Sequence, residues 1–148
     1  MKPQEGESEE VIDISERRNV ILMLLYSFYK MGREEVSLPE FLECAKMAQE
    51  KIPLKYEFSE RFLYSLDLLE DLRYLEYEGF AHRFTYKHDA FLPKRYITLT
   101  EFGRSHIKRI AQKLPEGIIQ TLDKSVLETV RRHEEKFKLF ARPVKTAI

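Results

Sequence analysis

The stretch from residue 59 to 103 constrains the fold of this chain more than any other. Leucines before Gly79 recur at helical spacing, and a glycine at that point suits the positive φ that often ends a helix. Segments 80–86 and 94–100 then alternate in polarity and are rich in aromatic and β-branched residues, as strands are. Thr100 is a suitable N-cap for a following helix. This order predicts a helix, a two-stranded hairpin and a second helix.

Apolar periodicity and capping residues predict the other helices. Residues 16–31 are apolar nearly all round, which indicates a central, buried helix. Ser37 and Glu40 fit the S-x-x-E capping box and predict a second helix. A helix over 100–113 should end before a proline, and a longer helix should follow over 116–138.

The 148 residues are expected to form one domain with an appended helix. We expect a flexible acidic N-terminus over 1–12 and the main domain over 13–114. A C-terminal helix with a loose tail should occupy 115–148, where the helix either mediates dimerisation or caps the core. The fold class that follows is α+β and mostly helical.

Composition indicates a soluble, cytoplasmic protein. The single cysteine, Cys44, cannot form an internal disulfide and lies among apolar residues, so we expect a small buried side chain and not a nucleophile. The acidic N-terminus does not resemble a signal peptide, and no apolar run approaches the roughly 18 residues of a membrane span. Heavy use of Lys, Arg and Glu is typical of thermophilic proteins.

Charge is unevenly distributed although the formal net charge is zero. Segments 1–16 and 56–79 each carry a net charge of −5, whereas 80–114 carries +6 and 128–145 carries +3. The basic charge therefore falls in and after the predicted hairpin, and the helix before it is acidic. This asymmetry is the most informative functional signal in the sequence.

Two motifs resemble known families. The third predicted helix resembles the Y-S-x-x-L-x-x-D-L-x-x-L-x-x-x-G pattern of SocA-like antitoxin domains, also called Panacea domains, and the end of the hairpin resembles the Y-x-x-L-T-x-x-G close of many winged-helix regulators. The resemblance implies a winged helix-turn-helix core with a short β-hairpin and an added C-terminal helix. It also implies binding to proteins, not catalysis. Phe62 and Leu63 stand where the antitoxin pattern has Gly-Pro, so the helix start is left open between Ser59 and Ser65. The matching residues are Tyr64, Ser65, Leu68, Asp71, Leu72, Leu75 and Gly79 in the first motif and Tyr96, Leu99, Thr100 and Gly103 in the second.

The leading functional hypothesis is a DNA-binding transcriptional regulator that contacts double-stranded DNA. Basic side chains in the hairpin and the next helix could neutralise the DNA backbone, and the start of the third helix could meet bases. The alternative for the basic residues is a solvated face that pairs with the acidic helix. The predicted phosphate contacts are Arg83, Lys87, Lys94, Arg95, Arg104 and Lys108, and those at the helix start are Ser59, Arg61 and Tyr64.

The competing hypothesis is a non-catalytic protein-interaction module of antitoxin or adaptor type. An exposed helix face carrying Glu60, Asp67 and Asp71 would repel phosphates. Exposed tyrosines such as Tyr64 and Tyr77 are common in protein interfaces, although partial burial against the hairpin is the alternative for them. Fold alone cannot decide, because one fold serves many functions.

No catalytic or cofactor motif is visible in the sequence. The four histidines lack metal-ligand spacing, there is no glycine-rich phosphate loop, and no nucleophile motif occurs. We therefore predict a protein without enzymatic activity, metal or cofactor.

A homodimer is expected from the last predicted helix, whose long apolar stripe would need cover. The alternative is that this helix folds back on the first helix and completes a monomeric core. The predicted dimer interface consists of Ile119, Leu122, Val126, Val130 and Phe137.

Overall fold

The computed structural model describes residues 13–86 and 94–147, with side chains placed for most of them. The chain has an α+β fold that is mostly helical, with a small antiparallel sheet, as the sequence predicted at this coarse level. In chain order the elements are α2 (Ile14–Lys30), β1 (Glu35–Ser37), α3 (Leu38–Ala48), α4 (Leu66–Tyr77), β2 (Ala81–Tyr86), β3 (Lys94–Leu99), α5 (Glu101–Ile110), the 3₁₀ turn η1 (Ala111–Lys113) and α6 (Glu116–Ala147).

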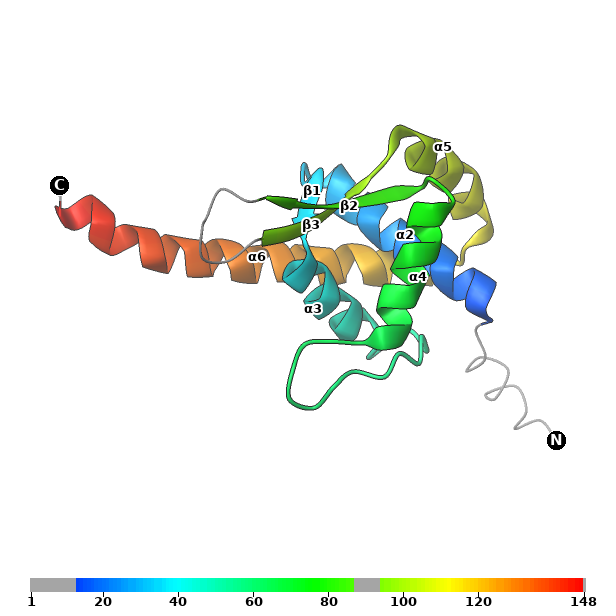
Figure 1. Cartoon of the computed structure of the whole chain (residues 1–148), viewed down its shortest axis with the longest axis horizontal. Coiled ribbons are helices and arrows are strands. Elements are labelled where there is room, and N and C mark those ends of the chain that lie inside the picture. Colours follow the sequence, from blue (N-terminus) through cyan, green and yellow to red (C-terminus); the bar gives the residue numbers. More distant parts are fainter. Residues whose placement is uncertain (1–12, 87–93, 148) are drawn as a thin grey trace.

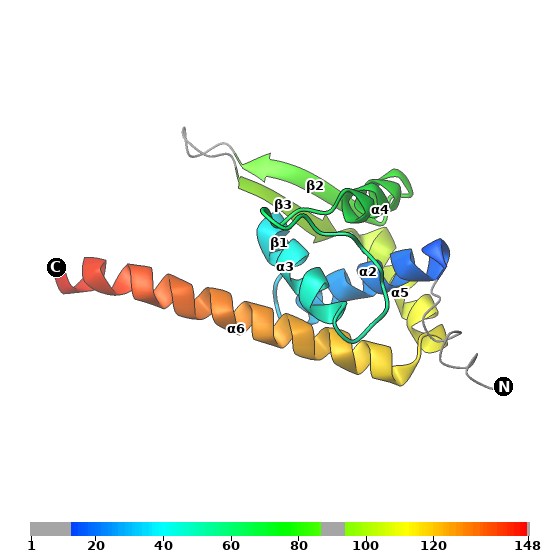
Figure 2. The same cartoon turned by 90° about the horizontal axis from the view of Figure 1, so that it is seen from below.

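Helix α2 is the centre of the molecule. It contacts α3, α4, α5 and α6 and also two strands of the sheet. Figures 1 and 2 show α4 and the β2–β3 hairpin on one side of α2 and α6 on the other. The apolar side chains from Val20 to Leu25, together with Phe28, are buried, which confirms the predicted central position.

The sheet has three strands in the order β1-β3-β2. The β2–β3 hairpin was predicted, and its register pairs Arg83 with Ile97 and Phe84 with Tyr96. Strand β1 was not predicted, because three residues are too few to establish an alternating pattern. It pairs Val36 with Ile97 on the core side of the sheet.

Capping residues place the helix ends where the sequence predicted them. The Glu40 N–H donates to Ser37 Oγ at 3.2 Å at the start of α3. The Gly103 N–H donates to Thr100 Oγ1 at 2.9 Å at the start of α5. Gly79 follows α4 with a φ of 85°. A side chain at Gly103 would collide with the Phe80 carbonyl oxygen, so glycine allows α5 to approach the hairpin.

Helix α6 packs across α2 and α3 within the same chain. Leu122, Val126 and Val130 are buried there, and the Ser27 hydroxyl of α2 donates to Asp123 at 2.7 Å. The predicted dimer interface is therefore wrong for these residues, because the monomeric core already covers them, and Ile119 packs against the same core. The side chain of Phe137 lies outside the described part of the chain. The helix continues to Ala147, so the predicted end near residue 138 and the loose tail are also wrong.

Helix α4 begins at Leu66, and the side chain of Ser65 caps it by accepting from the Leu68 N–H. Of the two predicted starts, Ser65 is thus the correct one. Ser59, Arg61 and Tyr64 lie in the preceding loop and not at the helix start, which corrects their predicted placement. In the parts of the chain that the structure covers, no helix combines the length and apolarity needed to cross a membrane.

Candidate functional site

A shallow groove of about 280 Å³ lies between the start of α3, helix α4 and the hairpin. Leu38 and Leu69 contribute its apolar wall from the two helices. Arg83, Phe84, Thr85 and Arg95 line it from the hairpin. Arginine is thus the only charged residue type in the lining.

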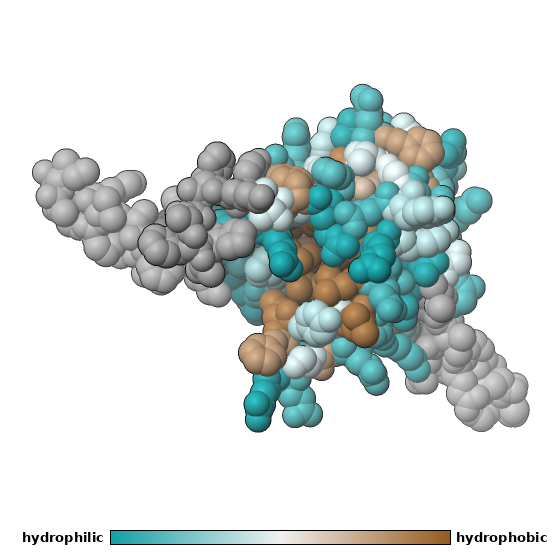
Figure 3. Space-filling view, viewed as in Figure 1, coloured by the Kyte–Doolittle hydropathy of each residue, from teal (hydrophilic) through white to brown (hydrophobic). Residues whose placement is uncertain are grey.

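The loop before α4 adds an exposed apolar surface. Phe62, Tyr64 and Leu66 are 69%, 45% and 56% exposed, and Leu63 beside them is also exposed. Leu66 lies one turn before Leu69 of the groove on the same helix. Figure 3 shows hydrophobic side chains gathered between the hairpin and this loop. We call Leu38, Phe62, Leu63, Tyr64, Leu66 and Leu69 together the apolar face.

The loop that carries the apolar face is held in place by hydrogen bonds and burial. The Gln49 side chain accepts from the Tyr56 N–H at 2.8 Å and donates to the Tyr56 carbonyl at 2.9 Å. Leu54 and Tyr56 are buried. Ser59 Oγ accepts from the N–H groups of the next turn, and the Ser59 N–H donates to the Tyr64 carbonyl at 2.8 Å. The exposed aromatic groups are therefore presented from a defined backbone.

A buried carboxylate anchors α4 from its opposite side. Asp71 is 2% exposed and accepts from Arg17 Nε at 2.8 Å, Arg18 Nε at 3.1 Å and the Tyr56 hydroxyl at 2.6 Å. The prediction that Asp71 lies on the exposed acidic face of the helix is therefore wrong. Burial, followed by the bond to Asp71, raises the pKa of Tyr56 well above its usual value. The cluster joins α2, the loop and α4.

The predicted phosphate-binding residues fall on two separate elements, the hairpin and α5, and of those that the structure describes only Arg83 and Arg95 share the groove. Arg83 donates to Glu76 through both its side chain, at 2.8 Å, and its N–H, at 3.0 Å, so its charge is balanced. Lys94 and Arg95 are exposed on β3. Arg104 and Lys108 lie on α5, which Figures 1 and 2 place at the end of the hairpin where β2 begins and β3 ends. Arg104 stacks on Tyr29 of α2 at 4.8 Å. Lys87 lies outside the described residues.

The exposed side of α4 has mixed charge. Glu70, Arg73 and Tyr77 follow one another at helical spacing, and all three are exposed. Asp67 is partly exposed one turn before Asp71. This helix therefore offers one cation beside two carboxylates, which is a poor match to a phosphate backbone.

Neither the Cys44 thiol nor the His106 imidazole has the environment of a reactive group. Burial raises the pKa of Cys44 to about 12, so the thiol stays protonated near neutral pH. Desolvation, followed by the charges of Arg109 and Lys113, lowers the pKa of His106, which stacks on Phe80 at 4.3 Å. Among residues 13–86 and 94–147, no group of histidine, cysteine and carboxylate side chains could hold a metal ion.

Apart from Tyr64, the residues of the apolar face were not predicted from the sequence, although a signal for them exists. Phe62, Leu63 and Tyr64 stand just before the Ser65 cap, where a helical periodicity cannot bury them. The groove could not be found in this way because it joins three separate elements. No protein-family profile matches the chain, and a search of curated proteins found no similar sequence.

Proposed function

We propose that the chain is a non-catalytic protein-interaction module with a winged-helix fold. The order of helices and strands from α2 to β3, with a sheet ordered β1-β3-β2, supports the winged-helix assignment. The support for a protein-interaction function comes from the apolar face and from the groove beside it. Large apolar side chains grouped on a surface usually mark an interaction site.

The partner is a protein segment that carries both apolar side chains and carboxylates. Its apolar side chains would cover Phe62 and Leu66 and fill the groove beside Leu69. Its carboxylates would face Arg95 and Lys94, two exposed cations of the hairpin, and would complement their charge. Such a partner suits an antitoxin or adaptor type of function.

Site-specific photo-crosslinking in cells of the native source tests this proposal. A benzophenone amino acid replaces Phe62, which keeps an aromatic group at the position, and Lys108 on α5 serves as the control position. We expect one discrete crosslinked protein from position 62, and the added change Leu66→Asp should abolish it. The same products from both positions, or insensitivity to Leu66→Asp, would contradict the proposal.

DNA binding is the second candidate function, favoured by the exposed Lys94 and Arg95 on the hairpin. Binding would then depend on backbone neutralisation and weaken as salt rises. Fluorescence anisotropy with a duplex at several salt concentrations measures this. Lys94→Ala or Arg95→Ala should each reduce the salt slope by about one. Without duplex binding at low ionic strength, this candidate is excluded.

A further inference from the structure

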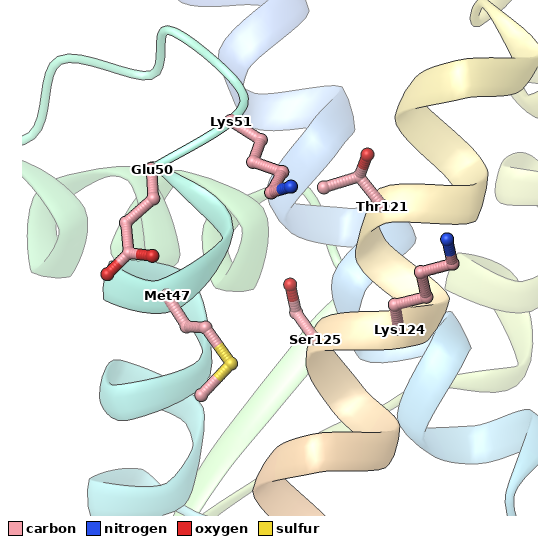
Figure 4. A pocket seen from close by; sticks show the side chains of 6 residues that line it. All are labelled: Met47, Glu50, Lys51, Thr121, Lys124 and Ser125. Atoms are coloured by element: carbon pink, nitrogen blue, oxygen red, sulfur yellow. The ribbon is translucent and has the colours of Figure 1, made fainter.

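A second pocket lies between the end of α3 and the first half of α6, and it shares no lining residue with the apolar face. Its volume is about 260 Å³, and it is lined by Met47, Glu50, Lys51, Thr121, Lys124 and Ser125. Figure 4 shows Lys51 reaching from the end of α3 toward Thr121 on α6. The lining therefore combines two ammonium groups and two hydroxyl groups with one carboxylate.

Ser125 is the most informative residue of this pocket. It is only 7% exposed, yet its hydroxyl forms no hydrogen bond with any described residue. No fully buried side-chain oxygen or nitrogen in the described part lacks a partner, so solvent must reach this hydroxyl. Figure 4 shows the hydroxyl directed into the space between the two helices. The hydroxyl of this buried residue is thus free to donate a hydrogen bond to a ligand.

The two lysines of the pocket also lack an ion-pair partner among the described residues. Neither Lys51 nor Lys124 forms an ion pair within the described ranges, although Asp123 next to Lys124 pairs with Lys30 at 3.3 Å. The carboxylate of Glu50 also belongs to the lining, on the α3 side of the pocket (Figure 4). With two ammonium groups and one carboxylate, the lining carries a net positive charge.

We propose that this pocket binds the phosphate group of a small phosphate monoester. Two cations and two hydroxyl donors match the charge and the acceptor oxygens of such a group, which carries close to two negative charges at neutral pH. The pocket is smaller than the roughly 300–1,000 Å³ of sites for drug-sized ligands, so it admits the phosphate and a short attached chain. Binding would bridge α3 and α6, and it does not depend on the proposed protein partner.

Titration with glycerol 1-phosphate, followed by amide chemical shifts, tests the proposal. Inorganic phosphate serves as a second dianionic probe, and sodium chloride at the same ionic strength is the control. We expect saturable shifts at Lys51, Thr121 and Ser125 with both phosphates. Equal shifts with chloride would overturn the proposal. Dimethyl phosphate, a monoanionic diester, should bind at least about fivefold more weakly; equally tight binding of the diester would overturn the assignment to monoesters.

Substitutions separate this site from general surface charge. Lys124→Gln and Ser125→Ala should each weaken binding by about tenfold, because each removes a donor to a charged oxygen. The matched control Lys108→Gln removes an exposed lysine of α5 and should leave affinity unchanged. Glu50→Gln should tighten binding about twofold to fivefold by removing the only carboxylate in the lining. If Lys124→Gln binds as tightly as Lys108→Gln, the proposal is wrong.

Discussion

The two sides of helix α4 reverse the usual distribution of side chains. Toward α2 the helix buries a carboxylate, Asp71, which is 2% exposed, whereas toward the groove it begins with Leu66, which is 56% exposed. A buried charge is costly unless it is paired, and three donors surround Asp71. The exposed leucine has no comparable explanation within the chain. The comparison suggests that the first side serves the fold and the second serves a partner.

Replacement of Asp71 tests the first side and should have the largest effect. Asp71→Asn leaves Arg17 and Arg18 without their counter-charge at a partly buried position. We expect a loss of about 3 kcal/mol in the free energy of unfolding. Urea denaturation measures it, with Asp67→Asn as the matched control, which should change stability by less than about 0.5 kcal/mol. Similar losses for both variants would show that the carboxylate does not anchor the helix.

Alkaline pH should weaken the same cluster through Tyr56. Its pKa in the folded protein is raised above the unfolded value of about 10, first by burial and then by Asp71. The folded state keeps the proton while the unfolded state loses it, so this stability is complete below pH 10 and declines as pH rises above it. The slope should approach about 1.4 kcal/mol per pH unit.

Urea denaturation of the wild type and Tyr56→Phe at pH 9 and pH 11 measures this contribution. The difference in stability between the two proteins should shrink at the higher pH, because phenylalanine cannot ionise. A difference that is constant between the two pH values would mean that Tyr56 ionises equally in both states.

Replacement of Leu66 tests the second side and should have the smallest effect on folding. Leu66→Asp changes an exposed side chain, so the free energy of unfolding should change by no more than about 0.5 kcal/mol. The crosslink from position 62 should nevertheless disappear, since the change places a charge in the apolar face. Thermal unfolding together with the crosslinking yield measures both quantities. A stability loss above about 1 kcal/mol would assign Leu66 to the core.

Local signals in the sequence predicted most of the elements. Ser37, Thr100 and Gly79 act at the ends of helices, and capping depends on neighbours only a few residues away. The alternating segments 81–86 and 94–99 formed the hairpin for the same reason. Strand β1 was missed because it is only three residues long and pairs with β3, about sixty residues later in the chain.

The candidate site and the position of α6 depend on contacts that a local pattern does not encode. The stripe through Leu122 and Val126 suits an intermolecular or an intramolecular contact equally, and the locations of α2 and α3 decide between them. Asp71 occupies a polar position of the helical pattern and was therefore placed at the surface. Its burial requires Arg17, Arg18 and Tyr56, which come from two other elements.

The packing of α6 on α2 also bears on how the chain is made. Ser27 and Asp123, which join the two helices, are 96 residues apart. Ribosomes add about 5–20 residues per second. Synthesis of α6, which covers α2, is therefore completed about 5–20 s after synthesis of α2. During that interval an apolar helix lacks part of its cover, which is the condition under which nascent chains aggregate. Slow translation after α5 should therefore increase the demand for chaperones.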